Sequence, residues 1–230
     1  MKQKGAFIVI DGIDGTGKET QAKLLVRQLE LIGYQVRQID FPQYKENFSG
    51  RILFDCKKGK YGDFSKVPPQ AAMLLYAADR FESKAKIEKW LAAKNILIAD
   101  RYVSANQIHQ GGKIKNPKKR SRFIKSLAEF EYGFLKLPKP DAVVFLDAEI
   151  KTVLKNLKTR GNLDCLEQNR EYLENSQASA RRVLKEDPSW LRVNCDRNGQ
   201  MLLREAINKK IMKVLTKKRI IPQDLFNPEC

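Results

Sequence analysis

Residues 11–20, with the sequence Asp-Gly-Ile-Asp-Gly-Thr-Gly-Lys-Glu-Thr, combine glycines and a lysine at a spacing that suits phosphate binding. An apolar run precedes this stretch at residues 6–10, and an apolar pattern with helical spacing follows it as far as Gly33. Glycines let successive backbone N–H groups face one anion, and the helix N-terminus adds the positive end of its dipole. Lys18 is placed to reach the β- and γ-phosphates of a nucleoside triphosphate. We therefore predict a phosphate-binding loop here rather than a glycine turn with a solvated lysine.

The residue after Lys18 departs from the usual pattern of such loops. A Ser or Thr that binds Mg²⁺ is expected there, but the chain has Glu19. Thr20 comes next, and one residue along a helix turns its side chain about 100° away. Glu19 can bind Mg²⁺ directly, hold it through water, or point to solvent. These alternatives stay open. The residues expected to bind the triphosphate are Gly12, Ile13, Asp14, Gly15, Thr16, Gly17, Lys18, Glu19 and Thr20.

Composition limits the class of protein. The chain has 230 residues, of which 42% are hydrophobic, and a formal charge of +17. This charge favours phosphate-carrying partners, although most of the basic residues are expected on solvated faces. The cysteines are scattered, which argues against a disulfide framework or a zinc site. With no secretory pattern and no run long enough to span a bilayer, we expect a cytoplasmic protein with no membrane partner.

Apolar strands and amphipathic helices alternate along the chain. Strands are expected at 6–10, 35–41, 95–99, 141–147 and 190–195. Helices are expected at 22–32, 50–57, 68–92, 103–110, 122–136, 150–159, 170–185 and 200–217. This alternation predicts an α/β fold, a five-stranded parallel sheet with helices on both faces. Ligands bind at the carboxyl ends of such strands, so the loop at Gly12, residues 41–42, residues 100–101 and the strand end at Leu146 should converge.

Several polar pairs fall where they can serve phosphate and base chemistry. Asp100 can orient metal-bound water, and Arg101 can clamp an anion through a bidentate fork. Tyr76 and Arg80 share a helix face, so one can stack on a base while the other bonds its edge. Each pair also has a structural reading, as a surface ion pair or as a core aromatic beside a solvated charge.

Two further features are expected near the reaction. The basic segment near 155–168, which contains Arg160, can form a mobile lid that closes over the triphosphate, or a plain surface turn. His109 is the single histidine of the chain. Phosphoryl transfer does not need a histidine base, so we interpret His109 as a wall of the substrate pocket.

Taken together, these residues resemble those of the bacterial thymidylate kinases, which belong to the P-loop nucleoside monophosphate kinases. The resemblance covers about residues 6–203. It depends on the segments 14–21, 41–42, 75–80, 100–106, 109–111 and 160–161. It implies a single P-loop kinase domain over residues 1–230 that transfers the ATP γ-phosphate to dTMP, with ATP and Mg²⁺ as cofactors and a homodimer as the assembly.

The resemblance also implies roles for individual residues. The catalytic residues would be Lys18, Arg101, Asp14 and Arg160, with Arg160 also binding ATP. The residues that bind the acceptor would be Asp14, Phe41, Tyr76, Arg80, Arg101, Asn106, His109 and Gln110. Glu19 and Asp100 are the candidate metal ligands. His109 stands where the family usually has an aromatic residue, often tyrosine, near the ribose 2′ position.

Two alternatives to a dTMP kinase remain at this stage. A kinase for dUMP, dCMP or another pyrimidine monophosphate would use the same fold and a different base pocket. A nucleic-acid-binding ATPase would explain the charge of +17, but it gives the Tyr76–Arg80 pair no role. We therefore do not expect nucleic acid to be a partner.

Overall fold

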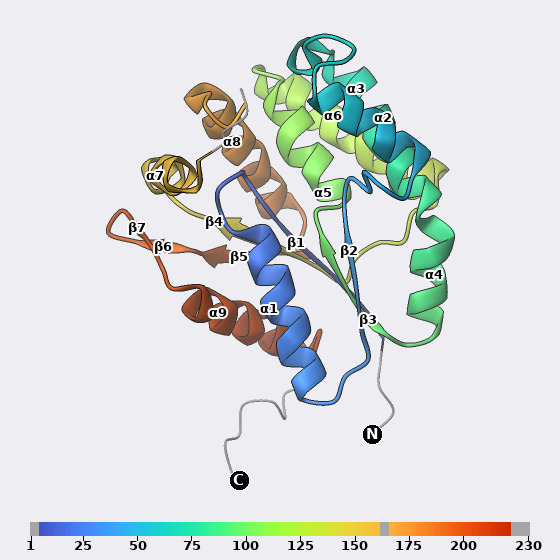
Figure 1. Cartoon of the computed structure of the whole chain (residues 1–230), viewed down its shortest axis with the longest axis vertical. Coiled ribbons are helices and arrows are strands. Elements are labelled where there is room, and N and C mark those ends of the chain that lie inside the picture. Colours follow the sequence, from blue (N-terminus) through green and yellow to red (C-terminus); the bar gives the residue numbers. More distant parts are fainter. Residues whose placement is uncertain (1–4, 162–165, 222–230) are drawn as a thin grey trace.

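The structure is a computed structural model that describes residues 5–161 and 166–221. Within these ranges a five-stranded parallel sheet has the order β2-β3-β1-β4-β5 (Figure 1). Its strands are β1 (Ala6–Gly12), β2 (Val36–Asp40), β3 (Ile96–Asp100), β4 (Ala142–Asp147) and β5 (Trp190–Asn194). Every residue of β1, β3 and β4 is buried, as expected for central strands covered on both faces. The predicted α/β fold with a five-stranded parallel sheet is therefore confirmed.

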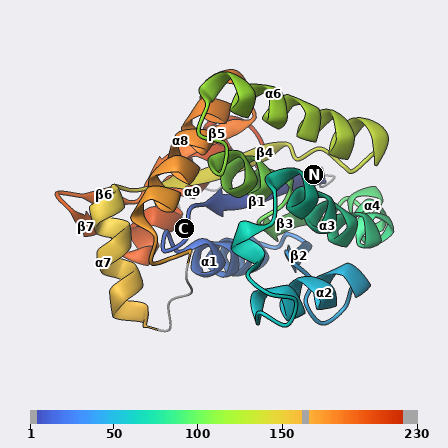
Figure 2. The same cartoon turned by 90° about the horizontal axis from the view of Figure 1, so that it is seen from above.

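Helices cover both faces of the sheet. The first and last helices of the described residues, α1 (Lys18–Leu31) and α9 (Arg204–Lys217), pack against each other on one face (Figure 1). The remaining helices are α2 (Phe48–Lys57), η1 (Phe64–Lys66), α3 (Pro69–Glu82), α4 (Lys84–Ala92), α5 (Val103–Ala105), η2 (Asn106–Gln110), α6 (Pro117–Ala128), η3 (Glu129–Phe134), α7 (Ile150–Arg160) and α8 (Arg170–Glu186). Figure 2 shows α6 and α8 across the sheet from α1. Among the described residues, no helix is both long and apolar enough to cross a membrane.

The sheet register brings the predicted loops together. Ile10 of β1 pairs with Asp100 of β3, and Asp40 of β2 pairs with the same residue. The N–H of Phe41 donates to the Asp100 carbonyl at 3.0 Å. A Cβ on Gly12 would lie 2.7 Å from the Leu146 carbonyl oxygen, so the end of β4 closes against the start of the loop. The predicted convergence at this edge is confirmed.

The long helix predicted for residues 68–92 is wrong, because α3 ends before Ser83 and α4 begins after it. The Asn47 side-chain amide donates to the Asp79 carbonyl at 2.6 Å, at the oxygen that the Ser83 N–H would bond in a continuous helix. The Ser83 N–H bonds to the Arg80 carbonyl instead. A polar side chain from a distant loop therefore divides the helix.

Two other predicted boundaries are also wrong. The helix expected from 122 begins five residues earlier, because Asn116 caps it by accepting the Lys119 N–H at 3.0 Å. The helix expected from 200 begins at Arg204, because residues 196–201 form a hairpin of β6 (Asp196–Arg197) and β7 (Gln200–Met201). Asn198 and Gly199 both have positive φ at its turn, as a type I′ hairpin turn requires.

Candidate active site

The loop between β1 and α1 is shaped to receive an anion. Gly15 and Gly17 have φ of 81° and 86°, values that favour glycine. Gly17 precedes α1 without any side-chain cap, so the first N–H groups of the helix are left for an external acceptor. Apart from Gly17 and its chain neighbours, no atom of the described residues lies within 4 Å of the place where a Gly17 Cβ would stand. The loop therefore offers uncapped donors and open space, which fit a phosphate.

Lys18 lies across this loop. Its side chain is buried, and Nζ donates to the Ile13 carbonyl at 2.9 Å and to Asp14 Oδ1 at 3.4 Å. Burial lowers the pKa of Lys18, and the nearby Arg101 charge lowers it further. The lysine is thus held at the loop by groups that a phosphate can replace.

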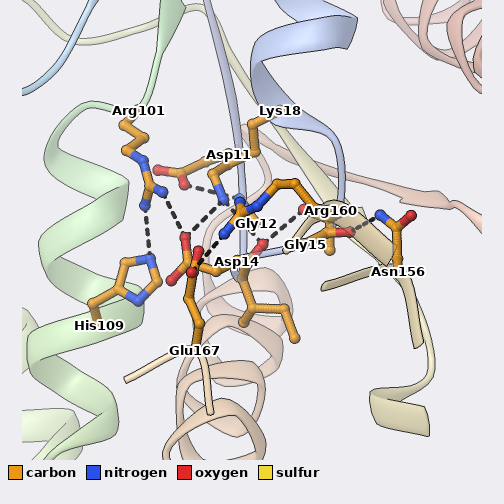
Figure 3. Close-up of polar contacts among 12 residues, drawn as sticks. Asp11, Gly12, Asp14, Gly15, Lys18, Arg101, His109, Asn156, Arg160 and Glu167 are labelled. Carbon is orange, nitrogen blue, oxygen red and sulfur yellow. Dashed lines mark hydrogen bonds and ion pairs between the residues drawn. The ribbon is translucent and has the colours of Figure 1, made fainter. Parts of the chain in front are cut away.

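Arg101 connects the loop to the next cavity. Its Nη2 donates to Asp14 Oδ1 at 2.6 Å, and Nη1 lies 3.1 Å from His109 Nε2 (Figure 3). Burial alone would raise the pKa of Asp14, but Arg101 and Lys18 outweigh it and hold that pKa well below the ordinary value. Arg101 has a φ of 67°, a backbone conformation that costs a non-glycine residue on the order of 1 kcal/mol. This strained backbone conformation occurs at Arg101, whose side chain is placed to bind an anion.

His109 is held as one neutral tautomer. A guanidinium can only donate, so Nε2 must accept from Arg101 and the ring proton must sit on Nδ1. Nδ1 lies 2.9 Å from the Tyr172 hydroxyl, which can take this proton as an acceptor. Burial lowers the pKa of His109 to about 3, and the Arg101 and Lys18 charges act in the same direction. His109 is therefore a fixed, uncharged wall of the site.

Beside Arg101 lies a cavity of about 410 Å³. All eight residues predicted to bind the acceptor line it: Asp14, Phe41, Tyr76, Arg80, Arg101, Asn106, His109 and Gln110. The half-buried ring of Tyr76 packs edge-on against Phe64, with centroids 6.2 Å apart. Gln110 is buried, and its Oε1 accepts no hydrogen bond in the described part of the chain. Asp14 belongs to both the loop and the cavity, so the two form one site.

Arg80 is buried more deeply than the sequence suggests. Its side chain is 2% exposed, and it makes a two-point ion pair with Glu131 at 2.6 and 2.8 Å. Burial would lower the pKa of Arg80, but Glu131 outweighs it and the pKa is raised. Asn106 donates to the same carboxylate at 3.0 Å. A buried acidic group therefore stands behind the cavity.

The two candidate metal ligands lie in different places. Asp100 is buried at the end of β3, and its Oδ1 lacks a hydrogen-bond partner among the described residues. Burial raises its pKa to about 6. Glu19 is 72% exposed and pairs with Lys23 at 2.6 Å on α1, and Thr20 is also exposed. Asp100 fits a site that holds Mg²⁺ together with phosphates and water, whereas the structure does not bring Glu19 into the site.

The C-terminal half of α7 lies against the loop. Asn156 donates to the Gly15 carbonyl at 2.7 Å, and Arg160 pairs with Glu167 at 2.5 Å. Figure 3 shows Arg160 and Glu167 meeting beside Asp14. Residues 162–165 of the predicted lid lie outside the described residues. Arg160 is therefore next to the phosphate-binding loop, as its predicted role requires.

The sequence prediction missed three polar groups at this site, of which Asp11 and Glu131 are buried and Tyr172 is half-buried. Asp11 accepts hydrogen bonds from the Ser104 hydroxyl at 2.6 Å and the Gly12 N–H at 2.8 Å, which ties the loop to α5. Tyr172 orients His109, and Glu131 holds Arg80 and Asn106. The Asp11–Gly12 sequence next to a buried strand was a usable signal for Asp11. Tyr172 and Glu131 come from distant helical segments and carry no local signal.

Comparison with known proteins gives a consistent result. The profile of a family described as thymidylate kinase matches residues 10–207. A probable thymidylate kinase of Pyrococcus horikoshii is 35% identical over 163 residues, 70% of this chain and 73% of that protein. A probable thymidylate kinase of Methanococcus aeolicus is 32% identical over 224 residues, 94% of this chain and 98% of that protein.

A bacterial protein and a solved structure are also similar to this chain. A thymidylate kinase of Exiguobacterium is 27% identical over 215 residues, 91% of this chain and 96% of that protein. The structure of thymidylate kinase from Candida albicans superposes with a TM-score of 0.74 at 21% identity, covering 96% of this chain and 95% of that one. At this identity the structural match shows the fold alone. Because these relatives include archaeal as well as bacterial proteins, the predicted family is confirmed but its bacterial type is not.

Proposed function

The chain belongs to the thymidylate kinase family, and from this premise we propose that it transfers the γ-phosphate of ATP to dTMP, giving dTDP and ADP. One observation carries the proposal. The Arg101 guanidinium, 2.6 Å from Asp14 of the phosphate-binding loop, also lines the neighbouring cavity. A phosphate held there by Arg101 lies next to a phosphate held by the loop, which is the arrangement that transfer between two nucleotides needs.

The chemistry follows from the charges of the site. An acceptor phosphate oxygen attacks the γ-phosphorus, and the bond between that phosphorus and the β–γ bridging oxygen breaks. The attacking oxygen carries no proton near neutral pH, so no general base is required, in keeping with a neutral His109. Lys18, Arg101 and Arg160 supply positive charge around the transferred group. When bound, Mg²⁺ neutralises charge on the phosphates, and Asp100 and Asp14 are the residues that would hold it or its water.

The far end of the cavity suits a pyrimidine base. Tyr76 presents an aromatic ring for stacking, and Phe64 holds that ring edge-on. Arg80 and Asn106 present polar atoms for the base edge. His109 occupies the wall between base and phosphate, where we propose that it contacts the sugar.

The segment 155–168 is proposed as a lid that closes over ATP. Asn156 already bonds to the loop, and Arg160 lies beside Asp14 (Figure 3). The Arg160–Glu167 ion pair offers a contact that a bound phosphate can replace. Closure would exclude water from the transferred phosphoryl group.

A homodimer is proposed on the basis of exposed apolar side chains. Leu74 and Phe81 lie seven residues apart on α3, so they share a face, and they are 49% and 48% exposed. Phe134, at the end of η3, is 76% exposed. Lys84 donates to the Leu135 carbonyl, which places the two regions next to each other. A patch of this kind marks a protein contact in many soluble proteins.

We also propose a cytoplasmic location, as expected from the sequence.

A substrate panel tests the function. ADP release from ATP and Mg²⁺ is measured with dTMP, dUMP, dCMP, AMP and GMP as acceptors. We expect dTMP to give the highest kcat/KM, with purine monophosphates inactive. A preference for another monophosphate would show a kinase with a different acceptor. ADP release that nucleic acid stimulates in the absence of an acceptor would contradict the proposal.

A further inference from the structure

Glu131 is a buried carboxylate directly behind the base end of the cavity. It is 0% exposed and does not line the cavity. Its Oε2 accepts from Arg80 Nε at 2.6 Å, and its Oε1 accepts from Arg80 Nη2 at 2.8 Å and Asn106 Nδ2 at 3.0 Å. Both of its donors belong to residues that do line the cavity. Glu131 can therefore control what the cavity offers to a ligand without touching that ligand.

The orientation of the Asn106 amide is fixed by these contacts. Nδ2 donates to Glu131 Oε1 and to the Met73 carbonyl at 3.1 Å, and both partners are acceptors. Turning the amide over would set Oδ1 against two acceptor oxygens. In the described part of the chain Oδ1 accepts no hydrogen bond, and it is absent from the fully buried polar atoms that lack partners. Asn106 thus presents an acceptor to the cavity.

Arg80 presents the opposite polarity. Of its five N–H groups, two donate to Glu131 and one on Nη1 donates to the Tyr102 carbonyl at 3.2 Å. The remaining N–H groups are on Nη1 and Nη2, at the end of a side chain that lines the cavity. The base end therefore has a donor from Arg80 beside an acceptor from Asn106.

We propose that Glu131 sets this donor–acceptor polarity and so makes the cavity select bases whose edge carries a carbonyl next to a ring N–H. Thymine and uracil have this edge, whereas cytosine carries an amino group next to an unprotonated ring nitrogen. Cytosine would place a donor against Arg80 and an acceptor against Asn106, which repel. The inference rests on the proposed function. It makes Glu131 a positioning residue for specificity.

Glu131→Gln tests the proposal with the acceptor pair dUMP and dCMP. These two substrates differ at the base edge alone, so the ratio of their kcat/KM values isolates the edge. Three N–H groups, two from Arg80 and one from Asn106, donate to the two carboxylate oxygens. Glutamine has one acceptor oxygen, and its NH2 group would face at least one of these donors, so the arrangement of Arg80 and Asn106 cannot be kept intact. We expect the dUMP:dCMP ratio to fall by about tenfold or more. A folded variant with the wild-type ratio would overturn the proposal.

Asp147→Asn is the matched control. Asp147 is a carboxylate with 0% exposure that pairs with Arg181 and Arg192, and it does not line the cavity. It should lower the melting temperature and leave the dUMP:dCMP ratio unchanged. If this control lowers the ratio as much as Glu131→Gln does, the effect comes from general destabilisation and the proposal fails.

If Glu131→Gln does not fold, the variant Asn106→Ala provides a second test. Asn106→Ala removes the acceptor and should lower the same ratio, so an unchanged ratio would overturn the proposal. Where both variants fold, Glu131→Gln should have a smaller effect in the Asn106→Ala background, because one of its two targets is gone. Absence of transfer to both dTMP and dUMP in the wild type would instead refute the proposed function.

Discussion

Replacement of His109 by glutamine should remove a contribution to stability that depends on pH. In the folded protein the pKa of His109 is about 3, against an ordinary value of 6.5, because the ring is buried beside Arg101 and Lys18. Below pH 6.5 the unfolded chain takes up a proton that the folded chain does not, so acid favours unfolding. The His109 contribution is therefore present above pH 6.5 and lost as the pH falls. Between pH 7 and pH 5 this loss amounts to about 2 kcal/mol.

Urea unfolding of the wild type and His109→Gln at pH 7 and pH 5 measures this contribution. Asp100 acts in the opposite direction, because burial raises its pKa to about 6 and its neutral form is stabilising below that pH. Asp100 is present in both proteins, so its effect cancels in the difference between them. The wild type should lose about 2 kcal/mol more than the variant on acidification. Equal losses in the two proteins would refute the neutral, Arg101-bound His109.

Three further substitutions test the site. Arg101→Met should lower kcat with dTMP by about a hundredfold or more while the Kd of ATP, measured by titration calorimetry, stays within about threefold; a matching loss of ATP affinity would place Arg101 on the donor. Gly15→Ala should raise the KM for ATP and cost about 1–3 kcal/mol in urea unfolding, because its Cβ would lie 2.7 Å from Leu157 Cγ at a φ of 81°; wild-type values would show that the loop is not held by α7. Glu19→Ala should leave the Mg²⁺ titration of activity unchanged, because Glu19 is exposed and pairs with Lys23; a higher Mg²⁺ requirement would return Glu19 to the metal site.

The sheet and the phosphate-binding loop could be predicted because their signals are local. A buried apolar run predicts a central strand, and a glycine-rich turn after it has few structural uses besides anion binding. The same locality explains the errors. The break at Ser83 depends on Asn47, which lies 36 residues earlier and takes the carbonyl that a continuous helix would need. No helical pattern within residues 68–92 contains that information.

Arg80 shows which property of the site could not be predicted from the sequence. Its spacing from Tyr76 predicted a shared face, and both side chains do line the cavity. Its deep burial could not be predicted, because the carboxylate that makes this burial possible is Glu131, 51 residues away in an aromatic stretch. An isolated buried arginine would cost several kcal/mol, whereas the two-point ion pair offsets this cost. Long-range polar partners of this kind are set by the packing of the helices.

If one site holds both a triphosphate donor and dTMP, the γ-phosphate moves directly from one nucleotide to the other. Incubation with ATP labelled at the γ-phosphate, Mg²⁺ and dTMP, followed by separation of the nucleotides, tests this directly. We expect the label to appear in dTDP, and Lys18→Met to abolish its appearance. Label released as inorganic phosphate, with none in dTDP, would contradict transfer between the two nucleotides.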